Sequence, residues 1–323
     1  MGALPAYRPM LARLGAVPDR DEGWAYEMKW DGVRALAYVA EGRVRLYSRN
    51  GKEITAAYPE LAGLAEAVGD RPCVLDGEVV AFDAQGRPSF EALQPRMHQR
   101  DPARVRRLMA VVPVGYLLFD VLHVGDTPVI SRPYRERREL LAGLVRPGPH
   151  WDVPPHLEGV PAAQVVDESR RLGLEGIVAK RVGSPYRPGR RSPEWRKVKN
   201  FRSQEVVVGG WQPGQGRRAD TIGSLLVGVY EDGRLRYAGH VGTGFTEAAL
   251  RELERLLRPL ERAASPFADE VPREFARNAH WVEPRLVGEV RYAEWTGDGR
   301  LRHPSWRGLR DDKRPEQVRR EDA

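Results

Sequence analysis

The sequence predicts an α+β protein with two domains, of which the first mixes strands and helices and the second is a small β-barrel. The chain has 323 residues, enough for about two domains with sizeable cores. Short apolar runs with strand-like alternation recur along the whole chain, whereas helical spacing occurs in only a few stretches. Strand patterns dominate after about residue 203. These observations predict a first domain at residues 1–202 and a second at 203–323.

Elements of the first domain follow from apolar periodicity and turn residues. The run 24–39 predicts strand on both sides of a turn at Asp31-Gly32. Apolar residues around Asp76-Gly77-Glu78 predict a strand, a tight turn and a second strand over 73–82. Helices are expected at 58–68, 134–145 and 162–172. Further strands are expected at 44–47, within 109–124, at 175–180 and at 195–199, and 186–193 is expected to be a basic loop.

The second domain has the pattern of a barrel. Strands are expected at 205–210, 224–230, 235–241 and 287–295, with a hairpin turn at Asp232-Gly233. Thr246 is a suitable N-cap for a helix that extends to about residue 262. About five strands with one intervening helix are typical of a β-barrel of the oligonucleotide-binding (OB) type. The charged tail from Asp311 onward is expected to fray.

Composition restricts the class of protein and its partners. The net charge of +7 and the sequence pI of about 9.6 favour a polyanionic partner, and nucleic acid is the first candidate. The sequence has neither an apolar run of about 18 residues nor the pattern of a signal peptide, so we expect no membrane association. Cys73 is the single cysteine, which excludes an internal disulfide framework. We therefore expect a cytoplasmic protein.

Lysine is rare in this chain, and its positions indicate chemistry. Six of the 52 basic residues are lysines and the rest are arginines. A guanidinium stays protonated in proteins, whereas an ammonium can lose its proton and become a nucleophile. The strongest position for such a nucleophile is Lys29, in Glu27-Met28-Lys29-Trp30-Asp31-Gly32-Val33-Arg34.

An ordered series of short motifs follows Lys29. They are Ser48-Arg49-Asn50-Gly51, Asp76-Gly77-Glu78, Phe119-Asp120, Glu175-Gly176, Lys197-Val198-Lys199 and a final segment from Arg302 to Lys313. The series resembles that of the covalent nucleotidyltransferases, which include ATP-dependent DNA ligases, RNA ligases and mRNA capping enzymes. It is most similar to the ligase domain of the bacterial ligase D group, and the resemblance covers nearly the whole chain. It implies a nucleotidyltransferase domain with ATP-grasp-like antiparallel sheets and helices, followed by an OB-fold barrel.

The resemblance also implies a reaction and its partners. Lys29 would attack the α-phosphate of ATP and hold AMP through its side-chain nitrogen. AMP would pass to a DNA 5′-phosphate, and an adjacent 3′-hydroxyl would displace it and seal the strand. The implied substrate is nicked or broken double-stranded DNA, in repair by non-homologous end joining. The implied partners are Ku and end-joining polymerase and nuclease proteins, and the implied state is a monomer at the nucleoid.

Roles for the remaining motif residues follow from the same resemblance and from their chemistry. Arg34 and Arg49 can donate to phosphate or ribose oxygens. Glu78 would accept from the ribose hydroxyl or help to hold metal, and Glu175 offers a carboxylate to Mg²⁺ or Mn²⁺. Phe119 could stack on adenine and Glu27 could read the adenine edge, although a structural role remains open for both.

Two cationic pairs complete the predicted site. Lys197 and Lys199 are two residues apart, so on a strand they share a face and can point at the same triphosphate. Arg302 and Arg310 lie far along the chain from Lys29, and we expect them to orient the leaving pyrophosphate.

Two alternatives remain at this stage. An RNA ligase or a capping-type enzyme uses similar motifs, although the complete final motif Arg310-Asp311-Asp312-Lys313 favours a DNA ligase. A non-catalytic nucleic-acid-binding protein would also explain the basic charge, although the intact set of lysines argues against it.

Overall fold

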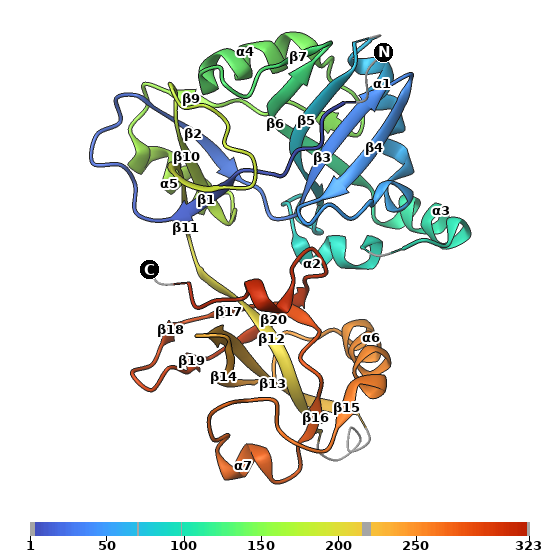
Figure 1. The fold of residues 1–323 in the computed structure, drawn as a ribbon, viewed down its shortest axis with the longest axis vertical. Coiled ribbons are helices and arrows are strands. Elements are labelled where there is room, and N and C mark those ends of the chain that lie inside the picture. Colours follow the sequence, from blue (N-terminus) through green and yellow to red (C-terminus); the bar gives the residue numbers. More distant parts are fainter. Residues whose placement is uncertain (1–3, 70, 98, 215–220, 322–323) are drawn as a thin grey trace. The chain divides into compact units, whose positions relative to one another are not determined.

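The structure is a computed structural model that describes residues 4–69, 71–97, 99–214 and 221–321. The chain divides into two compact units between Asn200 and Phe201 (Figure 1). The expected boundary near residue 203 lies within a few residues of this division. In the described ranges, no helix combines the length and the apolar character that crossing a membrane requires.

Unit 1 contains two sheets, the smaller of which has five strands. Helix α5 (Ala162–Arg171) covers one face of this sheet, where Val165 and Val166 pack against Trp24, Tyr26 and Ile177. The opposite face of the sheet carries polar side chains together with Trp195. In spatial order the strands are β1 (Leu11–Leu14), β11 (Arg191–Lys199), β10 (Gly176–Arg181), β2 (Trp24–Lys29) and β9 (Leu157–Glu158).

The larger sheet of unit 1 also has one apolar face. Alternate residues of its strands, such as Val33, Ala35 and Leu75, join a core with the surrounding helices. In spatial order the strands are β4 (Arg43–Ser48), β3 (Val33–Ala40), β5 (Cys73–Ala81), β6 (Val114–Val124) and β7 (Thr127–Pro128), and β8 (Trp151–Asp152) pairs in parallel with β6. The associated helices are η1 (Thr55–Ala57), η2 (Pro59–Gly63), α1 (Leu64–Ala67), α2 (Phe90–Leu93), η3 (Gln94–Arg96), α3 (Pro102–Val111) and α4 (Tyr134–Leu144).

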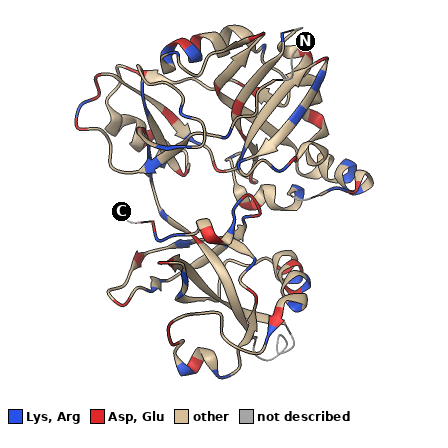
Figure 2. Ribbon diagram, in the orientation of Figure 1, with Lys and Arg blue, Asp and Glu red and all other residues tan. Residues whose placement is uncertain are grey.

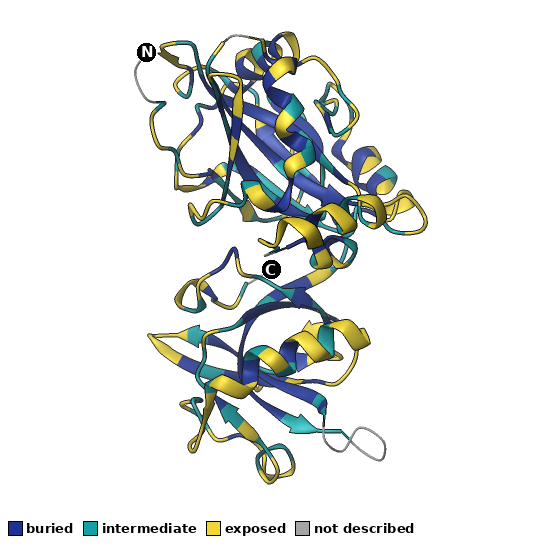
Figure 3. Cartoon of the chain, turned by 90° about the vertical axis from the view of Figure 1, so that its right-hand side faces the viewer, coloured by how far each residue is buried: buried dark blue, intermediate teal, exposed yellow. Residues whose placement is uncertain are grey.

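The two sheets of unit 1 face each other through a second, smaller apolar cluster. Leu36 and Val74 of the larger sheet contact the same cluster as Trp195 of the smaller sheet and Tyr186 from the preceding loop. All four are buried. The inner faces of both sheets therefore contribute side chains to one region, and Figure 3 shows the strands there as buried.

Unit 2 is the OB-type barrel. Strand β12 is its centre, because it pairs with β13, β16 and β17. The strands are β12 (Arg202–Pro213), β13 (Ile222–Glu231), β14 (Arg234–Val241), β15 (Glu261–Arg262), β16 (His280–Val282), β17 (Val287–Tyr292), β18 (Glu294–Trp295), β19 (Leu301–Arg302) and β20 (Ser305–Leu309). The helices are α6 (Glu247–Leu257), η5 (Arg258–Leu260), α7 (Arg273–Ala276) and η6 (Pro315–Gln317).

Local signals in unit 2 gave correct predictions. Asp232 and Gly233 both have positive φ, 49° and 74°, as the two-residue hairpin between β13 and β14 requires. The Thr246 side chain accepts a hydrogen bond from the amide of Ala249 and caps α6. The helix ends at Leu257, before the predicted 262, because Pro259 follows in η5.

Some predictions for unit 1 were wrong. Residues 73–82 do not form a hairpin, because β5 runs through Asp76-Gly77-Glu78 without a turn. The strands predicted on both sides of Asp31-Gly32 are confirmed as β2 and β3, and they belong to different sheets. The predicted helix at 58–68 is mostly 3-10 helix, and only Leu64–Ala67 is α-helical.

Two further predictions need correction, and one helix was not predicted. The strand expected within 109–124 is confirmed as β6, whereas the helix that precedes it, α3, was not predicted. The loop predicted at 186–193 ends earlier, because β11 begins at Arg191. The tail does not fray through residue 321 as expected: Asp312 and Val318 are buried, and the Lys313 ammonium forms an ion pair with Glu205.

Candidate active site

Strand register gathers the predicted lysines on one face of the five-stranded sheet. Opposed residues of antiparallel strands point to the same face, and so do residues two apart on one strand. Lys29 is opposite Gly176 on one side of β10, and Lys199 is opposite Gly176 on the other. Glu27 and Lys197 flank Val178 in the same way. All four side chains therefore share the face that α5 does not cover.

Gly176 is required at the centre of this arrangement. Its backbone has a φ of +147°, and a Cβ atom there would lie 2.0 Å from the carbonyl oxygen of Val198. The absence of a side chain lets β10 and β11 approach closely between Lys29 and Lys199. Gly32 has a comparable role, because a Cβ atom there would lie 2.2 Å from the carbonyl oxygen of Val79.

The Lys29 side chain is paired with Glu175. The Lys29 ammonium donates to the Glu175 carboxylate, and the two side chains are 22% and 6% exposed. The main chain of Glu175 is fixed by Asn200, whose main-chain N–H donates to the main-chain carbonyl oxygen of Glu175 at 2.8 Å. The predicted nucleophile and the predicted metal ligand are thus in direct contact.

Glu27 is a buried carboxylate that lies between two cations and a hydroxyl group. Its oxygens lie 2.6 Å from Lys180 Nζ and 3.6 Å from Arg138 Nε, and the Tyr134 hydroxyl donates to it. Burial raises the pKa of the Glu27 carboxyl, but the charges of Lys180 and Arg138 outweigh burial and lower that pKa overall. The Glu27 carboxylate is therefore ionised at neutral pH.

Lys180 is enclosed by aromatic rings. Its ammonium lies 4.2 Å from the ring centre of Trp195, 4.5 Å from that of Phe119 and 5.1 Å from that of Tyr134. Its side chain is 2% exposed, and this burial lowers the pKa of Lys180. Phe119, predicted as an adenine platform, is 8% exposed and contacts this ammonium.

Arg34 is held by a buried carboxylate rather than pointing freely outward. Its Nε and Nη2 each donate to Asp76 at 2.5 Å, and its guanidinium lies 4.5 Å from the ring centre of Phe119. Asp76 is fully buried and also accepts from the Tyr186 hydroxyl at 2.6 Å. The Asp76 carboxylate raises the pKa of Arg34 against the effect of burial. The predicted contact of Arg34 with ATP remains a prediction.

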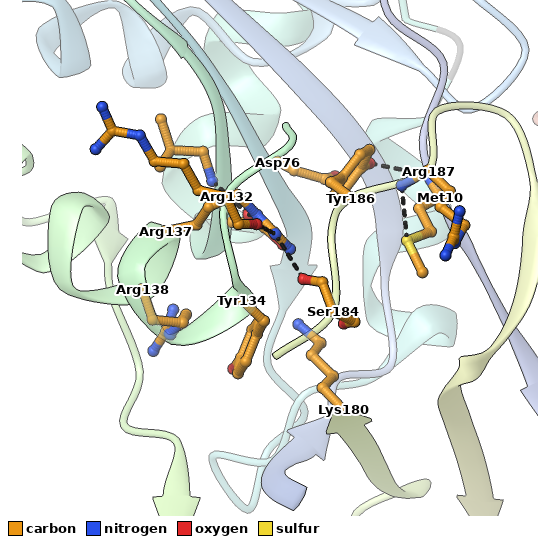
Figure 4. A network of polar contacts seen from close by, with 12 residues as sticks. Met10, Asp76, Arg132, Tyr134, Arg137, Arg138, Lys180, Ser184, Tyr186 and Arg187 are labelled. Atoms are coloured by element: carbon orange, nitrogen blue, oxygen red, sulfur yellow. Dashed lines mark hydrogen bonds and ion pairs between the residues drawn. The ribbon is translucent and has the colours of Figure 1, made fainter. Parts of the chain in front are cut away.

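A second buried ion pair supports the same region (Figure 4). Arg137 on α4 donates from Nε and Nη2 to the Asp120 carboxylate at 2.7 and 3.0 Å. Its Nη1 donates to the carbonyl oxygens of Arg132 and Ser184 at 2.6 and 2.9 Å. Asp120 is opposite Asp76 on the neighbouring strand, so each of these adjacent carboxylates has its own arginine.

Arg49 and Glu78 lie close to Arg34 along the larger sheet. Glu78 is half-buried and opposite Arg34 on β5. Arg49 follows Ser48, which is opposite Ala35, in a turn closed by a hydrogen bond from Gly51 to Ser48. The register places Glu78 on the same face of the larger sheet as Arg34, and nucleotide contacts of Arg49 and Glu78 remain predictions.

The two predicted arginines of unit 2 differ in their surroundings. Arg302 is about half exposed and forms an ion pair with Glu294 at 2.6 Å. Arg310 donates to both oxygens of Asp312 at 2.8 Å and to Glu289 at 2.6 Å, and these carboxylates raise its pKa. Arg310 therefore stabilises the barrel itself, whereas Arg302 has a surface position.

Two family models match the chain in the order of its two units. Residues 9–199 match the ATP dependent DNA ligase domain, and residues 218–313 match the ATP dependent DNA ligase C terminal region. The chain belongs to the ATP-dependent DNA ligase family.

Individual ligases support this assignment. The chain is 45% identical over 97% of its length to the multifunctional non-homologous end joining DNA repair protein LigD of Mycobacterium tuberculosis, and it spans about 40% of that protein. It is 34% identical over 95% of its length to DNA ligase C2 of Mycolicibacterium smegmatis and covers 92% of that ligase. A solved structure of mycobacterial DNA ligase D complexed with ATP and MES is 43% identical, with a TM-score of 0.71 and 98% coverage of both chains.

The candidate site also contains residues that the sequence alone did not reveal. Lys180, Tyr134 and Arg138 all contact Glu27, but their separation along the chain hides this proximity. One signal was available for Lys180: it is one of only six lysines and ends the strand pattern that begins at Glu175. Because β10 is a strand, Lys180 lies on the same face as Val178, the residue that Glu27 and Lys197 flank.

Proposed function

We propose that this ligase seals breaks in double-stranded DNA through AMP carried on Lys29. One observation carries the proposal. A lysine with a carboxylate partner lies on a sheet face that also presents Glu27, Lys197 and Lys199, opposite a second sheet that contributes Arg34 and Phe119. This arrangement provides a nucleophile, cations for a triphosphate and an aromatic ring for a base in one region.

The reaction has three phosphoryl-transfer steps. Deprotonated Lys29 Nζ attacks the α-phosphorus of ATP, a nitrogen–phosphorus bond forms, and pyrophosphate leaves. An oxygen of the DNA 5′-phosphate then attacks the same phosphorus and releases Lys29. Finally the 3′-hydroxyl loses its proton, attacks the 5′-phosphorus and expels AMP. Such chemistry depends mainly on positioning and on stabilisation of charge.

The side chains of the site divide this work. Lys197 and Lys199 neutralise and orient the triphosphate, and Phe119 provides a ring edge or face for adenine. Glu27, ionised and fixed by Lys180 and Tyr134, accepts a hydrogen bond from the adenine amine. Glu175 positions the Lys29 side chain before ATP arrives, and Lys29 must leave this partner and lose a proton before it attacks.

The acidic residues of the site suit a divalent cation. No group of three or more metal-ligating side chains occurs in the part of the chain that the structure describes. Mg²⁺ in nucleotide sites needs only one or two carboxylates, because phosphate oxygens and water supply the rest. Glu175 and Glu78 would hold the ion. When bound, it neutralises phosphate charge and disfavours the protonated form of the nearby amine.

Wider roles follow from the relatives. The name of the mycobacterial LigD refers to non-homologous end joining, which supports a role for this chain in joining broken DNA ends. We propose Ku and end-joining polymerase and nuclease proteins as partners. We also propose that the chain acts as a monomer in the cytoplasm, at the nucleoid.

A substrate comparison tests the proposal. The full chain is incubated with nicked duplex DNA or nicked duplex RNA, and with ATP or GTP, in the presence of Mg²⁺. We expect sealing of nicked DNA with ATP and little sealing in the other combinations. Preferential sealing of RNA would indicate an RNA ligase, and binding of DNA without transfer of AMP would indicate a non-catalytic protein. Either result would contradict the proposed function.

A further inference from the structure

Helix α3 carries arginines that no acidic side chain neutralises. Its ten residues, Pro102–Val111, include Arg104, Arg106 and Arg107 but no aspartate or glutamate. All three arginines are exposed. Within the described ranges, none of the three has an ion-pair or hydrogen-bond partner for its guanidinium. The chain has 45 acidic residues in all, but none of them lies on α3 to neutralise its three arginines.

The exposed arginines of helices α5 and α6 are paired with acidic residues. On α5, Arg170 and Arg171 form ion pairs with acids three residues earlier at 2.9 and 2.6 Å. On and just after α6, Arg251, Arg255 and Arg258 each pair with a glutamate of the same helix. Figure 2 shows this difference, with blue and red side by side on α6 and blue predominating on α3. The positive charge of α3 is therefore available to an external anion.

The three arginines spread over the outward side of α3. Val105 is 2% exposed and fixes the inward side. At 100° per residue, Arg107 lies nearly opposite Val105, and Arg104 and Arg106 lie on either side of that outward direction. Ala103 and Ala110 are exposed between them and are too small to shield the guanidinium groups. A flat polyanion could thus approach all three.

The position of α3 is fixed by a buried arginine. Arg96 is fully buried and donates to the carbonyl oxygens of Ala57 at 2.6 Å and Val112 at 2.8 Å. It also forms an ion pair with Glu60 at 2.7 Å. These contacts tie both ends of the segment around α3 to the rest of unit 1, and the Asp101 side chain caps the helix by accepting from the Ala103 amide.

The same segment touches the loop that follows Lys29. The amide of Phe90, the first residue of α2, donates to the Asp31 carboxylate at 3.1 Å. Asp31 is two residues from the predicted nucleophile. The connection between β5 and β6, which contains α2 and α3, is therefore attached at one end to the loop that follows Lys29 and presents the α3 arginines further along.

We propose that α3 is a DNA-contacting helix whose three arginines bind the phosphate backbone of the duplex beside the break. The proposal rests on the proposed function, because that function makes duplex DNA the substrate. Arginine is well suited to phosphate, to which it donates two parallel hydrogen bonds. Contacts of this kind hold and orient a duplex without reading its sequence, as an enzyme that seals breaks at any sequence requires.

The test compares two triple variants with equal loss of charge. One is Arg104→Gln, Arg106→Gln and Arg107→Gln on α3, and the control is Arg251→Gln, Arg255→Gln and Arg258→Gln at α6. The dissociation constant for a nicked duplex is measured between 50 and 200 mM salt, and AMP transfer to the protein is measured without DNA. Melting curves followed by circular dichroism check that both variants are folded.

The expected effect follows from release of counterions. Each lost phosphate contact lowers the slope of log K against log salt by about 0.9, so the α3 variant should lose about 2.7. Between 50 and 200 mM salt, the affinity of the α3 variant for the duplex should therefore fall about 40-fold less than that of the wild type. The control should keep the slope of the wild type, and both variants should accept AMP from ATP at the wild-type rate.

Three results would overturn the inference. The first is a salt slope in the α3 variant equal to that of the wild type. The second is an equal reduction of the salt slope in the α6 control. The third is a reduced slope of the α3 variant on duplex RNA but not on duplex DNA. Failure of the proposed function is distinct from all three, because the wild type would then fail to accept AMP or fail to seal nicked DNA. A wild type that seals normally, with an α3 variant of unchanged slope, contradicts only the role of α3.

Discussion

The charge balance around Glu27 makes an asymmetric prediction for two substitutions. Glu27 is one buried anion between two buried cations, Lys180 at 2.6 Å and Arg138 at 3.6 Å. Glu27→Gln leaves both cations without their shared carboxylate. Lys180→Met leaves Glu27 with Arg138 and the Tyr134 hydroxyl, and the methionine sulfur suits the surrounding aromatic rings. We therefore expect Glu27→Gln to be the more destabilising change.

The magnitudes follow from the burial of these groups. Leaving a buried charge without its partner costs about 3–5 kcal/mol, which applies to Glu27→Gln. Losing one hydrogen bond to a charged group costs about 1.5–3 kcal/mol, which applies to Lys180→Met. For a unit of this size, the larger loss corresponds to a fall of roughly 6–20 °C in melting temperature. The double variant should be more stable than Glu27→Gln alone, because it also removes Lys180, one of the two cations that Glu27→Gln leaves without a carboxylate.

The pH dependence of stability provides a second readout. The folded-state pKa of Glu27 is lowered, so Glu27 stabilises the fold fully above its unfolded pKa of about 4.3. That contribution is lost as the pH falls through the folded-state value. The difference in stability between wild type and Glu27→Gln should therefore be constant near neutral pH and shrink below about pH 4.

Urea denaturation followed by circular dichroism measures all of these quantities, with titration from pH 7 to pH 3. Greater destabilisation by Lys180→Met than by Glu27→Gln would refute the argument that Glu27 is a single buried anion shared by two buried cations. A difference between wild type and Glu27→Gln that stays constant down to pH 3 would refute the assignment of a lowered pKa to this carboxyl.

Other predictions concern the backbone, the barrel and the metal. Gly176→Ala should abolish AMP transfer or folding of unit 1, whereas Gly183→Ala, where a Cβ atom meets nothing within 4 Å, should be harmless; equal activity would contradict the steric argument. Arg310→Ala should lower the melting temperature of the barrel, whereas Arg302→Ala should change it little, since exposed pairs contribute about 0–1 kcal/mol. Arg302→Ala should instead slow self-adenylation more than sealing of pre-adenylated DNA, and equal loss in both steps would disprove that role. EDTA should stop self-adenylation and Mg²⁺ restore it; labelling in excess EDTA would exclude a metal.

Some of the site could be predicted because strand periodicity is local. Lys197 and Lys199 are two apart and lie on one face, as expected for a strand. The N-cap at Thr246 and the turn at Asp232-Gly233 were also recognisable from adjacent residues. In each case the residues that determine the structure are close together in the chain.

The remaining features depend on contacts between distant residues. Asp76-Gly77 looks like a turn, because a lone aspartate followed by glycine disfavours a strand interior. In the fold, Arg34 and Tyr186 satisfy the Asp76 carboxylate, so β5 continues through it. The role of Lys180 was hidden for the same reason, since its partner Glu27 lies on another strand. These pairs join residues far apart in the chain, so their spacing in the sequence does not predict them.

The central claim is that the Lys29 amine carries AMP. Lys29→Arg retains the positive charge but removes a nitrogen that can lose its proton, and Lys52→Arg, at an exposed lysine, is the matched control. Each protein is incubated with ATP labelled at the α-phosphate and then denatured. The account predicts label that survives denaturation on the wild type and on Lys52→Arg, and none on Lys29→Arg. Label on Lys29→Arg at the wild-type level, with normal sealing of nicked DNA, would contradict it.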